Sequence, residues 1–461
     1  MTAHLSLRPA MRDSGLGWLG AIPAHWEVRR IRNLAQMRVS NVDKISQDHE
    51  RPVRLCNYSD VYYNERISAD MPFMRATASS EEIARFRLRV GDVLITKDSE
   101  AWNDIGVPAY VESSADDLVS GYHLALLRPD PAQLNGAYLN RALSSFGVAS
   151  QLYVRANGVT RYGLPQNAIL SLWLPVPPVA EQAAIVRFLD HADERIQRYI
   201  RAKEKLIALL EEQKQAAIHD AVTGQIDVRT GQHYPAYKES GLSGPGAMPE
   251  HWQARKLKTV CQIRYGLGQP PPEHVDGLPL IRATNVSRGR ITEKDLIRVD
   301  PSTVPASRNA VLQEGEIVVV RSGAYTADSA IIPHAYAGAI SGYDMVVTAV
   351  GAQPRFVAAA LLCPYLRDDQ LVIESMRAAQ PHLNAEELGS AVLLLPPRCE
   401  QSAIVQFLDQ VETLSDSYVA RASRQVELMR EFRVRLIADV VTGNLDVRGA
   451  AAKLREAEPS D

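Results

Sequence analysis

The stretch PPVAEQAAIVRFLD (residues 177–190) recurs almost unchanged as PPRCEQSAIVQFLD (396–409). The two copies are 219 residues apart (396 − 177). The same distance separates TGQIDVR (223–229) from TGNLDVR (442–448). Matching segments at a fixed separation indicate a tandem duplication of one structural unit.

The segments upstream of these motifs are also repeated. IPAHW (22–26) matches MPEHW (248–252), so Trp26 and Trp252 are 226 residues apart (252 − 26). Between the conserved flanks the copies differ and only short echoes remain, which are predicted to be strands ended by turns. The echoes are LCNYSDV (55–61) with LIRATNV (280–286), GDVLIT (91–96) with GEIVVV (315–320), and SGYH (120–123) with SGYD (341–344). The two variable segments are therefore expected to share a fold but not a surface.

The order of the flanks predicts where the termini lie. In the middle of the chain TGQIDVR runs into YPAYKESGL (234–242), whereas TGNLDVR lies near one end and RPAMRDSGL (8–16) near the other. The repeated unit reads continuously only if the termini are adjacent. We therefore expect a closed, pseudo-two-fold arrangement.

Each copy contains one long helical pattern. Pro177 and Pro178 precede the first helix, Glu181 lies in its opening turn and Gly224 closes it. Apolar residues recur with 4-3 spacing over roughly 40 residues, a rod of about 60 Å at ~1.5 Å per residue. This spacing predicts an antiparallel coiled coil that acts as a spacer, with a few polar seam positions setting the register. The alternative is two separate amphipathic helices, each packed on its own domain. The predicted seam is Ile185, Leu189, Ala192, Ile196, Tyr199, Lys203, Leu206, Leu210, Gln213 and Ala217 in the first copy, and Ile404, Leu408, Val411, Ser415, Tyr418, Ala422, Gln425, Met429, Phe432 and Leu436 in the second.

Length and composition fit a multidomain globular protein. The chain has 461 residues, of which 46% are hydrophobic and 23% charged. No apolar run approaches the ~20 residues of a membrane span, and the N-terminus lacks a signal-peptide core. The four cysteines are scattered, which argues against a disulfide framework or a zinc site and is typical of a reducing compartment. We therefore expect a cytoplasmic protein with no membrane association.

Charge gives no sign of a polyanionic partner. The net charge is −3, and residues 27–175 hold 17 basic and 17 acidic side chains. Residues 253–395 hold 14 of each. Nucleic-acid binders usually carry a basic surplus, so the balance counts against DNA binding.

Motifs for catalysis are missing from the sequence. It contains no GxxxxGK[ST], no GxGxxG after a strand, no HExxH and no GxSxG. It also lacks the Asn/Asp-Pro-Pro-aromatic tetrapeptide of amino-methyltransferases. Histidines such as His25, His123 and His251 have no partner pattern and are more often structural. The chain is therefore predicted to be a binding protein with no catalytic residue, cofactor or metal of its own.

Two different domains between repeated Pro-Pro-x-x-Glu-Gln helices resemble the specificity subunit of a type I restriction-modification enzyme. The resemblance rests on the repeated helix starts, on IPAHW and MPEHW, and on the strands after Gly91 and Gly315. It implies an α+β fold with two α/β target recognition domains, separated by two helices that form an antiparallel coiled coil. The implied ranges are 1–176 and 225–395 for the domains, 177–224 and 396–443 for the helices, and 444–461 for a C-terminal tail.

The resemblance also implies partners. Each domain would read one half of a bipartite site in double-stranded DNA, and the helices would dock two methyltransferase subunits. Those subunits would supply S-adenosylmethionine, and separate restriction subunits would use ATP and Mg²⁺ for translocation. Two alternatives stay open: the specificity partner of a fused methyltransferase-nuclease, and a coiled-coil scaffold with two ligand-binding domains and no DNA role.

Candidate DNA contacts are polar and basic residues on loops, since base edges are read by Arg, Lys, Asn, Gln, Ser and Thr. The loop RANGVTRYG (155–163) is the best candidate, because its glycines let the backbone approach a phosphate. The second copy has RAAQPHLN (377–384) there, without glycine. In the first domain the candidates are Asn57, Tyr58, Ser59, Lys97, Ser99, Tyr122, His123, Arg155, Asn157, Thr160 and Arg161. In the second they are Arg282, Thr284, Asn285, Arg321, Ser322, Tyr343, Asp344, Arg377, Gln380 and His382. The repeated His-Trp pairs are assigned to the scaffold, where each Trp anchors the start of its domain.

Overall fold

The chain forms two compact units joined by two long helices. The computed structural model describes residues 6–7, 10–242, 244–376 and 380–457. Unit 1 comprises Met1–Lys203 and Arg424–Asp461, and unit 2 comprises Glu204–Ser423. Helices α6 (Val179–Thr223) and α11 (Arg398–Val441) each begin in one unit and end in the other. Within the described ranges, no helix combines the length and apolar character that a membrane span requires.

The globular part of unit 1 is built on a five-stranded sheet of order β5-β13-β9-β11-β7, flanked by a three-stranded sheet of order β12-β6-β8. Strand β13 (Leu124–Pro129) is buried on both faces: Leu124 and Leu126 pack into one apolar cluster, and Ala125 and Leu127 into another. A continuous apolar run is typical of such a strand. The other strands are β1 Ser6–Leu7, β2 Met11–Asp13, β3 Ala21–Pro23, β4 Glu27–Arg30, β5 Ala35–Val39, β6 Arg51–Cys56, β7 Arg66–Ile67, β8 Met74–Ala78, β9 Val93–Thr96, β10 Asp98–Ser99, β11 Pro108–Val111, β12 Leu118–Ser120, β14 Tyr162–Gly163 and β15 Trp173–Val176. The helices are η1 Ile31–Asn33, α1 Tyr58–Tyr63, α2 Ser80–Phe86, α3 Gly136–Leu143, α4 Phe146–Tyr153 and α5 Gln166–Leu170.

Unit 2 repeats this topology with different lengths. Its sheets have the orders β19-β27-β24-β25 and β23-β20-β26, and β18 pairs with β28 as β4 pairs with β15 in unit 1. Thus the two segments share a fold, as the echoes predict. The strands are β16 Tyr237–Glu239, β17 Ala247–Pro249, β18 Gln253–Lys256, β19 Cys261–Tyr265, β20 Glu273–Ile281, β21 Val286–Ser287, β22 Arg290–Ile291, β23 Ile297–Val299, β24 Ile317–Val319, β25 Ser329–Ile331, β26 Ile340–Ser341, β27 Met345–Ala349 and β28 Val392–Leu395. The helices are η2 Leu257–Thr259, η3 Ala283–Asn285, η4 Pro301–Thr303, η5 Ala306–Arg308, η6 His334–Tyr336, α7 Pro354–Leu362, α8 Pro364–Leu366, η7 Arg367–Val372, α9 Ile373–Ser375 and α10 Ala385–Ser390.

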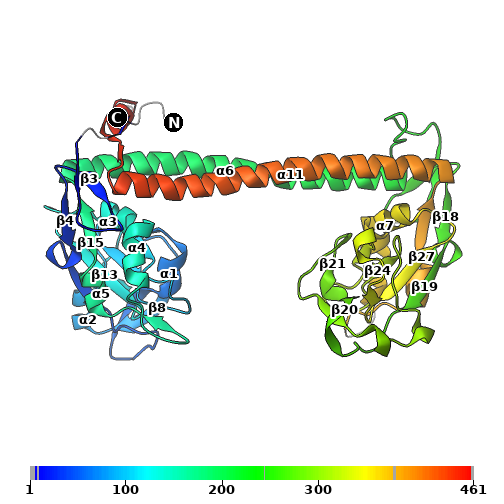
Figure 1. The fold of residues 1–461 in the computed structure, drawn as a ribbon, viewed down its shortest axis with the longest axis horizontal. Helices are drawn as coiled ribbons and strands as arrows, with labels where there is room; N and C mark the ends of the chain where they lie inside the picture. Colours follow the sequence, from blue (N-terminus) through cyan, green and yellow to red (C-terminus); the bar gives the residue numbers. More distant parts are fainter. Residues whose placement is uncertain (1–5, 8–9, 243, 377–379, 458–461) are drawn as a thin grey trace. The chain divides into compact units, whose positions relative to one another are not determined.

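Within each unit the two long helices run antiparallel, side by side (Figure 1). In unit 1, Arg433 Nε donates to Asp193 Oδ1 at 3.0 Å, and Tyr199 Oη donates to Gln425 Oε1 at 3.2 Å. In unit 2, Lys214 Nζ donates to Asp416 Oδ1 at 3.0 Å. The residue number therefore rises along α6 as it falls along α11. The antiparallel coiled coil predicted from the repeat is present.

The seam of this helix pair differs from the predicted heptads. Tyr199 and Tyr418 are 37% and 55% exposed, whereas Ile200 and Val426 are 4% and 5% exposed. Buried and half-buried positions repeat every 11 residues instead of every seven. An 11-residue repeat averages 3.67 residues per turn, closer to the natural 3.6 of an α-helix than a heptad is. The predicted seam positions that are exposed are Tyr199, Leu206, Gln213 and Tyr418; Gln425 is half-buried, and the adjacent Ile207, Lys214, Val419 and Val426 are half-buried or buried.

The C-terminal segment is not a simple tail. Strand β29 (Leu445–Asp446) pairs antiparallel with β1, and helix α12 covers Arg448–Ala457. Val447 and Ala451 are buried in the core of unit 1. The β1–β29 pairing brings the two ends of the chain together, in agreement with the predicted adjacent termini.

Candidate nucleic-acid interface

The repeated motifs meet where each globular part joins the helices. His251 Nε2 lies 2.8 Å from Glu400 Oε1, and Trp252 Nε1 donates to Glu400 Oε2 at 3.0 Å. The equivalent His25 Nε2 lies 2.8 Å from Glu181 Oε2 in unit 1. Since both histidines and both glutamates belong to the repeat, these contacts explain why His-Trp and Glu-Gln recur together. They form the scaffold of the joint.

The glutamine of each Pro-Pro-x-x-Glu-Gln motif completes the joint. Gln182 Nε2 donates to the carbonyl of Pro177 at 2.8 Å, and its Oε1 accepts from the backbone N–H of Asn135 at 2.7 Å. In unit 2, Gln401 Oε1 accepts from the backbone N–H of Gln353 at 2.8 Å. Asn135 and Gln353 are the N-cap residues of α3 and α7. The sequence singled out this motif, but not its role of joining the long helix to the next helix of the core.

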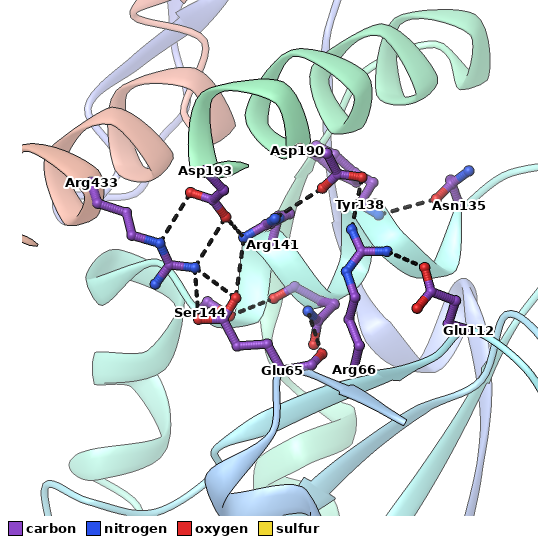
Figure 2. Close-up of polar contacts among 11 residues, drawn as sticks. Glu65, Arg66, Glu112, Asn135, Tyr138, Arg141, Ser144, Asp190, Asp193 and Arg433 are labelled. Atoms are coloured by element: carbon purple, nitrogen blue, oxygen red, sulfur yellow. Dashed lines mark hydrogen bonds and ion pairs between the residues drawn. The ribbon is translucent and has the colours of Figure 1, made fainter. Parts of the chain in front are cut away.

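A network of ion pairs further ties unit 1 to both long helices (Figure 2). Arg433 of α11 contacts Asp193 of α6 and, at 2.6 Å, Glu65. Arg141 of α3, only 7% exposed, contacts Asp193 at 2.6 Å and Asp190 at 2.9 Å. Although burial opposes its charge, the hydrogen bonds to Asp193 and Glu65 raise the pKa of Arg433. Such charge-assisted contacts fix the orientation of the globular part on its helices.

The candidate loops of unit 1 lie close together, at the ends of strands. Asp98 Oδ2 accepts from His123 Nδ1 at 2.8 Å and from Lys97 Nζ at 3.3 Å. Ser99 pairs with Tyr162 in the β10–β14 ribbon, where the glycine loop ends. Asn57 caps helix α1 beside Gly121, where an added Cβ would lie 2.9 Å from the carbonyl of Cys56. Four segments that are distant in sequence therefore form one surface, and Asp98 is a member that sequence reasoning missed.

The conformation of the glycine loop itself requires Gly158. Gly158 has φ +148°, and a Cβ there would lie 2.0 Å from the carbonyl oxygen of Arg161. No other residue fits without moving the backbone. The side chains of the loop are exposed and available to a ligand: Arg155, Asn157, Thr160 and Arg161.

Two further candidates in unit 1 are less accessible. Ser99 is 8% exposed, and its Oγ accepts from the backbone N–H of Ala101 at 3.2 Å. Tyr58 is half-buried; burial raises its pKa, although a hydrogen bond with Ser99 opposes that rise. Ser99 therefore positions its neighbours instead of presenting its own side chain. Ser59 and Tyr122 are exposed.

In unit 2 the candidates gather around Arg321. Its Cζ lies 4.3 Å from the ring centroid of Tyr343 and 4.6 Å from that of Tyr265. Its Nη2 lies 3.0 Å from His382 Nε2. Tyr265, at the end of β19, was missed from the sequence; an aromatic residue before the turn Gly266–Gly268 was the available signal. The result is an arginine held by three side chains from three different segments.

A pocket of about 170 Å³ adjoins this cluster. Its lining includes four predicted residues: Arg282, Ser322, Tyr343 and Asp344. Leu267, Pro270 and Leu280 make up much of the rest and give it an apolar wall. Four of the candidates of the second domain therefore line one pocket in the surface.

Two candidates in unit 2 have structural positions and must be corrected. Asn285 is completely buried, and its Nδ2 donates to the carbonyls of Thr292 and Lys294 at 3.2 and 2.8 Å. Asp344 is 3% exposed and accepts from the backbone N–H of Arg321 at 3.2 Å. Asn285 does not reach the surface, and Asp344 holds the backbone of Arg321 in place at the wall of the pocket. Thr284 and Gln380 are exposed. Arg377 lies outside the described residues.

Equivalent positions in the two units carry different chemistry. Six residues after the turn glycines Gly91 and Gly315 come Lys97 and Arg321, each at the end of the central strand β9 or β24. Lysine is a compact point charge, whereas arginine is a planar fork of donors. The arrangement suits contact with polyanions and with hydrogen-bonding ligand edges, and it differs between the units.

Comparisons with known proteins agree with this architecture. No protein-family model matches the chain. A Methanocaldococcus jannaschii protein, named as the type I restriction enzyme MjaX specificity subunit, is 24% identical over 270 residues, which cover 57% of this chain. The chain thus spans about 60% of the length of that relative. The Escherichia coli K12 type I restriction enzyme EcoKI specificity subunit is 19% identical over 444 residues, covering 94% of this chain and 90% of its own length.

A solved structure with a similar fold comes from the same kind of system. A chain in a solved structure of a type I R-M system, described for complex assembly and conformational transition, superposes with a TM-score of 0.69 at 16% identity. The superposition covers 92% of this chain and 99% of that one. The repeated joint, the two units of common topology and the sequence matches lead to one conclusion. The chain resembles the specificity subunits of type I restriction enzymes in sequence, and it shares the fold of a chain from a type I R-M system.

Proposed function

We propose that this chain is the non-catalytic DNA-recognition subunit of a type I restriction-modification complex, and that each unit reads one half of a bipartite site. The observation that carries the proposal is the pair of equivalent surfaces with different side chains, Lys97–His123 in unit 1 and Arg321–Tyr343 in unit 2. A protein made of two identical reading units recognises a palindrome. Two different units on a common topology suit two unrelated half-sites separated by base pairs that are not read.

The proposed contacts divide into phosphate and base contacts. Lysine and arginine side chains such as Lys97, Arg155 and Arg161 would neutralise phosphates, with Gly158 allowing the backbone to approach. Amide and hydroxyl groups such as those of Asn157 and Thr160 would read base edges in the major groove. The accessible members of the proposed interface are Asn57, Tyr58, Ser59, Lys97, Tyr122, His123, Arg155, Asn157, Thr160, Arg161, Arg282, Thr284, Arg321, Ser322, Tyr343, Gln380 and His382.

The balanced charge of the chain restricts how it binds. With a net charge of −3, the isolated chain should have low non-specific affinity, because that affinity comes from phosphate neutralisation. The remaining phosphate contacts would come from partner subunits. In this proposal the helices α6 and α11 set the separation of the half-sites and dock two methyltransferase subunits. Those subunits bring S-adenosylmethionine, and restriction subunits bring ATP and Mg²⁺.

The test is single-molecule methylation mapping of host DNA with and without this gene. Loss of one asymmetric, bipartite adenine-methylation motif is the expected result. As a matched control, replacing residues 253–395 by the equivalent segment of another specificity subunit should change one half of the motif and leave the other half intact. If no motif disappears, and a gel shift with the methyltransferase subunits present shows no specific complex, the proposal is wrong.

A further inference from the structure

The guanidinium of Arg321 is held in place before any ligand binds. Its Cζ lies within 4.6 Å of the ring centroids of both Tyr265 and Tyr343, and His382 Nε2 lies 3.0 Å from its Nη2. The backbone on either side is also fixed: Arg321 N–H donates to Asp344 Oδ1 at 3.2 Å, and its carbonyl accepts from Leu383 N–H at 2.7 Å. A free arginine would lose considerable rotamer entropy on binding. Here most of that loss has already occurred on folding.

The cluster remains open to a ligand. Tyr343 and Tyr265 are 45% and 38% exposed, and Arg321 itself is half-buried. The pocket of about 170 Å³ lies beside it, lined by Tyr343 and Ser322. Arg321 offers more donors than its one side-chain contact, to His382, uses. A buried structural arginine would have a carboxylate partner, yet none of the described ion pairs includes Arg321. The fixed, partly open fork is therefore available for an acceptor pair outside the protein.

Among DNA bases, guanine best matches such a fork. Its O6 and N7 are adjacent acceptors in the major groove, and a bidentate arginine is their commonest specific partner. We propose that Arg321 reads a guanine in the half-site of unit 2, and that Tyr265, Tyr343 and His382 are positioning residues for its guanidinium. This inference rests on the proposed function. It deepens that function, because it assigns one base of one half-site to one side chain.

The equivalent position of unit 1 provides the contrast. Lys97 has no planar fork, and it lies 3.3 Å from Asp98 Oδ2, the carboxylate that also contacts His123. Because a point charge discriminates less between acceptor patterns than a fork does, the same structural position should confer a guanine requirement in unit 2 only.

The experiment uses the full chain with its methyltransferase subunits and a DNA library randomised across the methylated motif. The variant Arg321→Lys keeps the charge and removes the fork. Its expected effect is a loss of roughly 5- to 150-fold in discrimination at one G·C pair of the unit 2 half-site, with the other half-site still required. Tyr265→Leu should relax the same base pair by a smaller factor, since the fork remains but is no longer held. Arg308→Lys, an exposed arginine of the same unit, is the matched control and should leave the motif unchanged.

The possible outcomes are distinguishable. Retained recognition of the other half-site shows that the variant folds. A uniform loss of methylation across all sequences would mean that Arg321 contacts a phosphate, and relaxation at an A·T pair would mean that it reads another base; either result overturns the inference. An unchanged motif in Arg321→Lys also overturns it. A wild-type complex that yields no motif at all would instead overturn the proposed function.

Discussion

Glycine 224 ends helix α6 where the helix meets the globular part of unit 2, and its replacement by alanine should weaken that unit. Gly224 has φ +76°, and a Cβ there would lie 2.5 Å from Pro249 Cδ and 3.2 Å from Trp252 Cη2. These are atoms of two rings, and Trp252 is completely buried. Neither ring can swing aside as the end of a flexible side chain would. The joint therefore tolerates no side chain at this position.

The magnitude has two parts. A left-handed backbone costs an alanine about 1–2 kcal/mol. Forcing an extra carbon into a packed core costs about 1–3 kcal/mol more. Gly224→Ala should thus lower the free energy of unfolding by roughly 2–5 kcal/mol. Gly231 is the matched control, because its φ is +73° but nothing lies within 4 Å of its Cβ position. Gly231→Ala should therefore cost only the backbone contribution and not the steric one.

The assay is urea denaturation of both variants, combined with hydrogen exchange of peptides from unit 2. Peptides from the globular part of unit 1 serve as the internal reference. The entropy that alanine removes from the unfolded chain is the same in both variants and cancels in their difference. The expected difference is about 1–3 kcal/mol. Equal losses in the two variants would refute the steric reasoning.

Three further perturbations follow from the same structure. Glu400→Ala leaves the indole N–H of Trp252 without its acceptor, so urea denaturation should show that the free energy of unfolding falls by about 1–3 kcal/mol. Glu400→Gln should restore most of this loss, and an unchanged denaturation midpoint in Glu400→Ala would contradict the expectation. Burial raises the pKa of Asp344 from 3.8 to about 6, so the folded state holds this proton to higher pH than the unfolded state. Its contribution of about 3 kcal/mol is present below pH 3.8 and is lost as the pH rises to about 6, and Asp344→Asn should remove this part of the pH profile; parallel profiles would refute it. In thermal denaturation, Ile200→Ala should lower the free energy of unfolding by about 2–5 kcal/mol and Tyr199→Ala by under about 1 kcal/mol. The reverse order would show that Tyr199, and not Ile200, lies in the seam.

Much of the fold could be predicted from repetition. The helix ranges expected at 177–224 and 396–443 contain the observed Val179–Thr223 and Arg398–Val441. Their ends carry local signals, proline before the first turn and glycine after the last, which depend only on nearby backbone. Repetition itself marked the joint, since residues that must fit one another in both units changed little in either.

The sequence pattern could not show which residues of the two long helices form their common seam. Heptad and 11-residue spacings agree for the first few turns and differ by about 20° per heptad thereafter. Tyr199 and Ile200 are both plausible apolar seam residues by type, and only the position of the partner helix selects Ile200. The same limit applies to the C-terminal segment, whose alanines gave no sign that Ala451 is buried in the core.

Local sequence was enough to predict two related but different units joined by a pair of long helices, because a duplication and the ends of helices can both be recognised from short segments. The candidate surface was only partly determined in this way. Residue type identified Arg321 and Asn285 as equally good candidates. The tertiary structure buried Asn285 beneath its own loop and placed Tyr265 and His382 against Arg321. The physical reason is that exposure and side-chain partners depend on contacts between segments far apart in the chain, and no local pattern records those contacts.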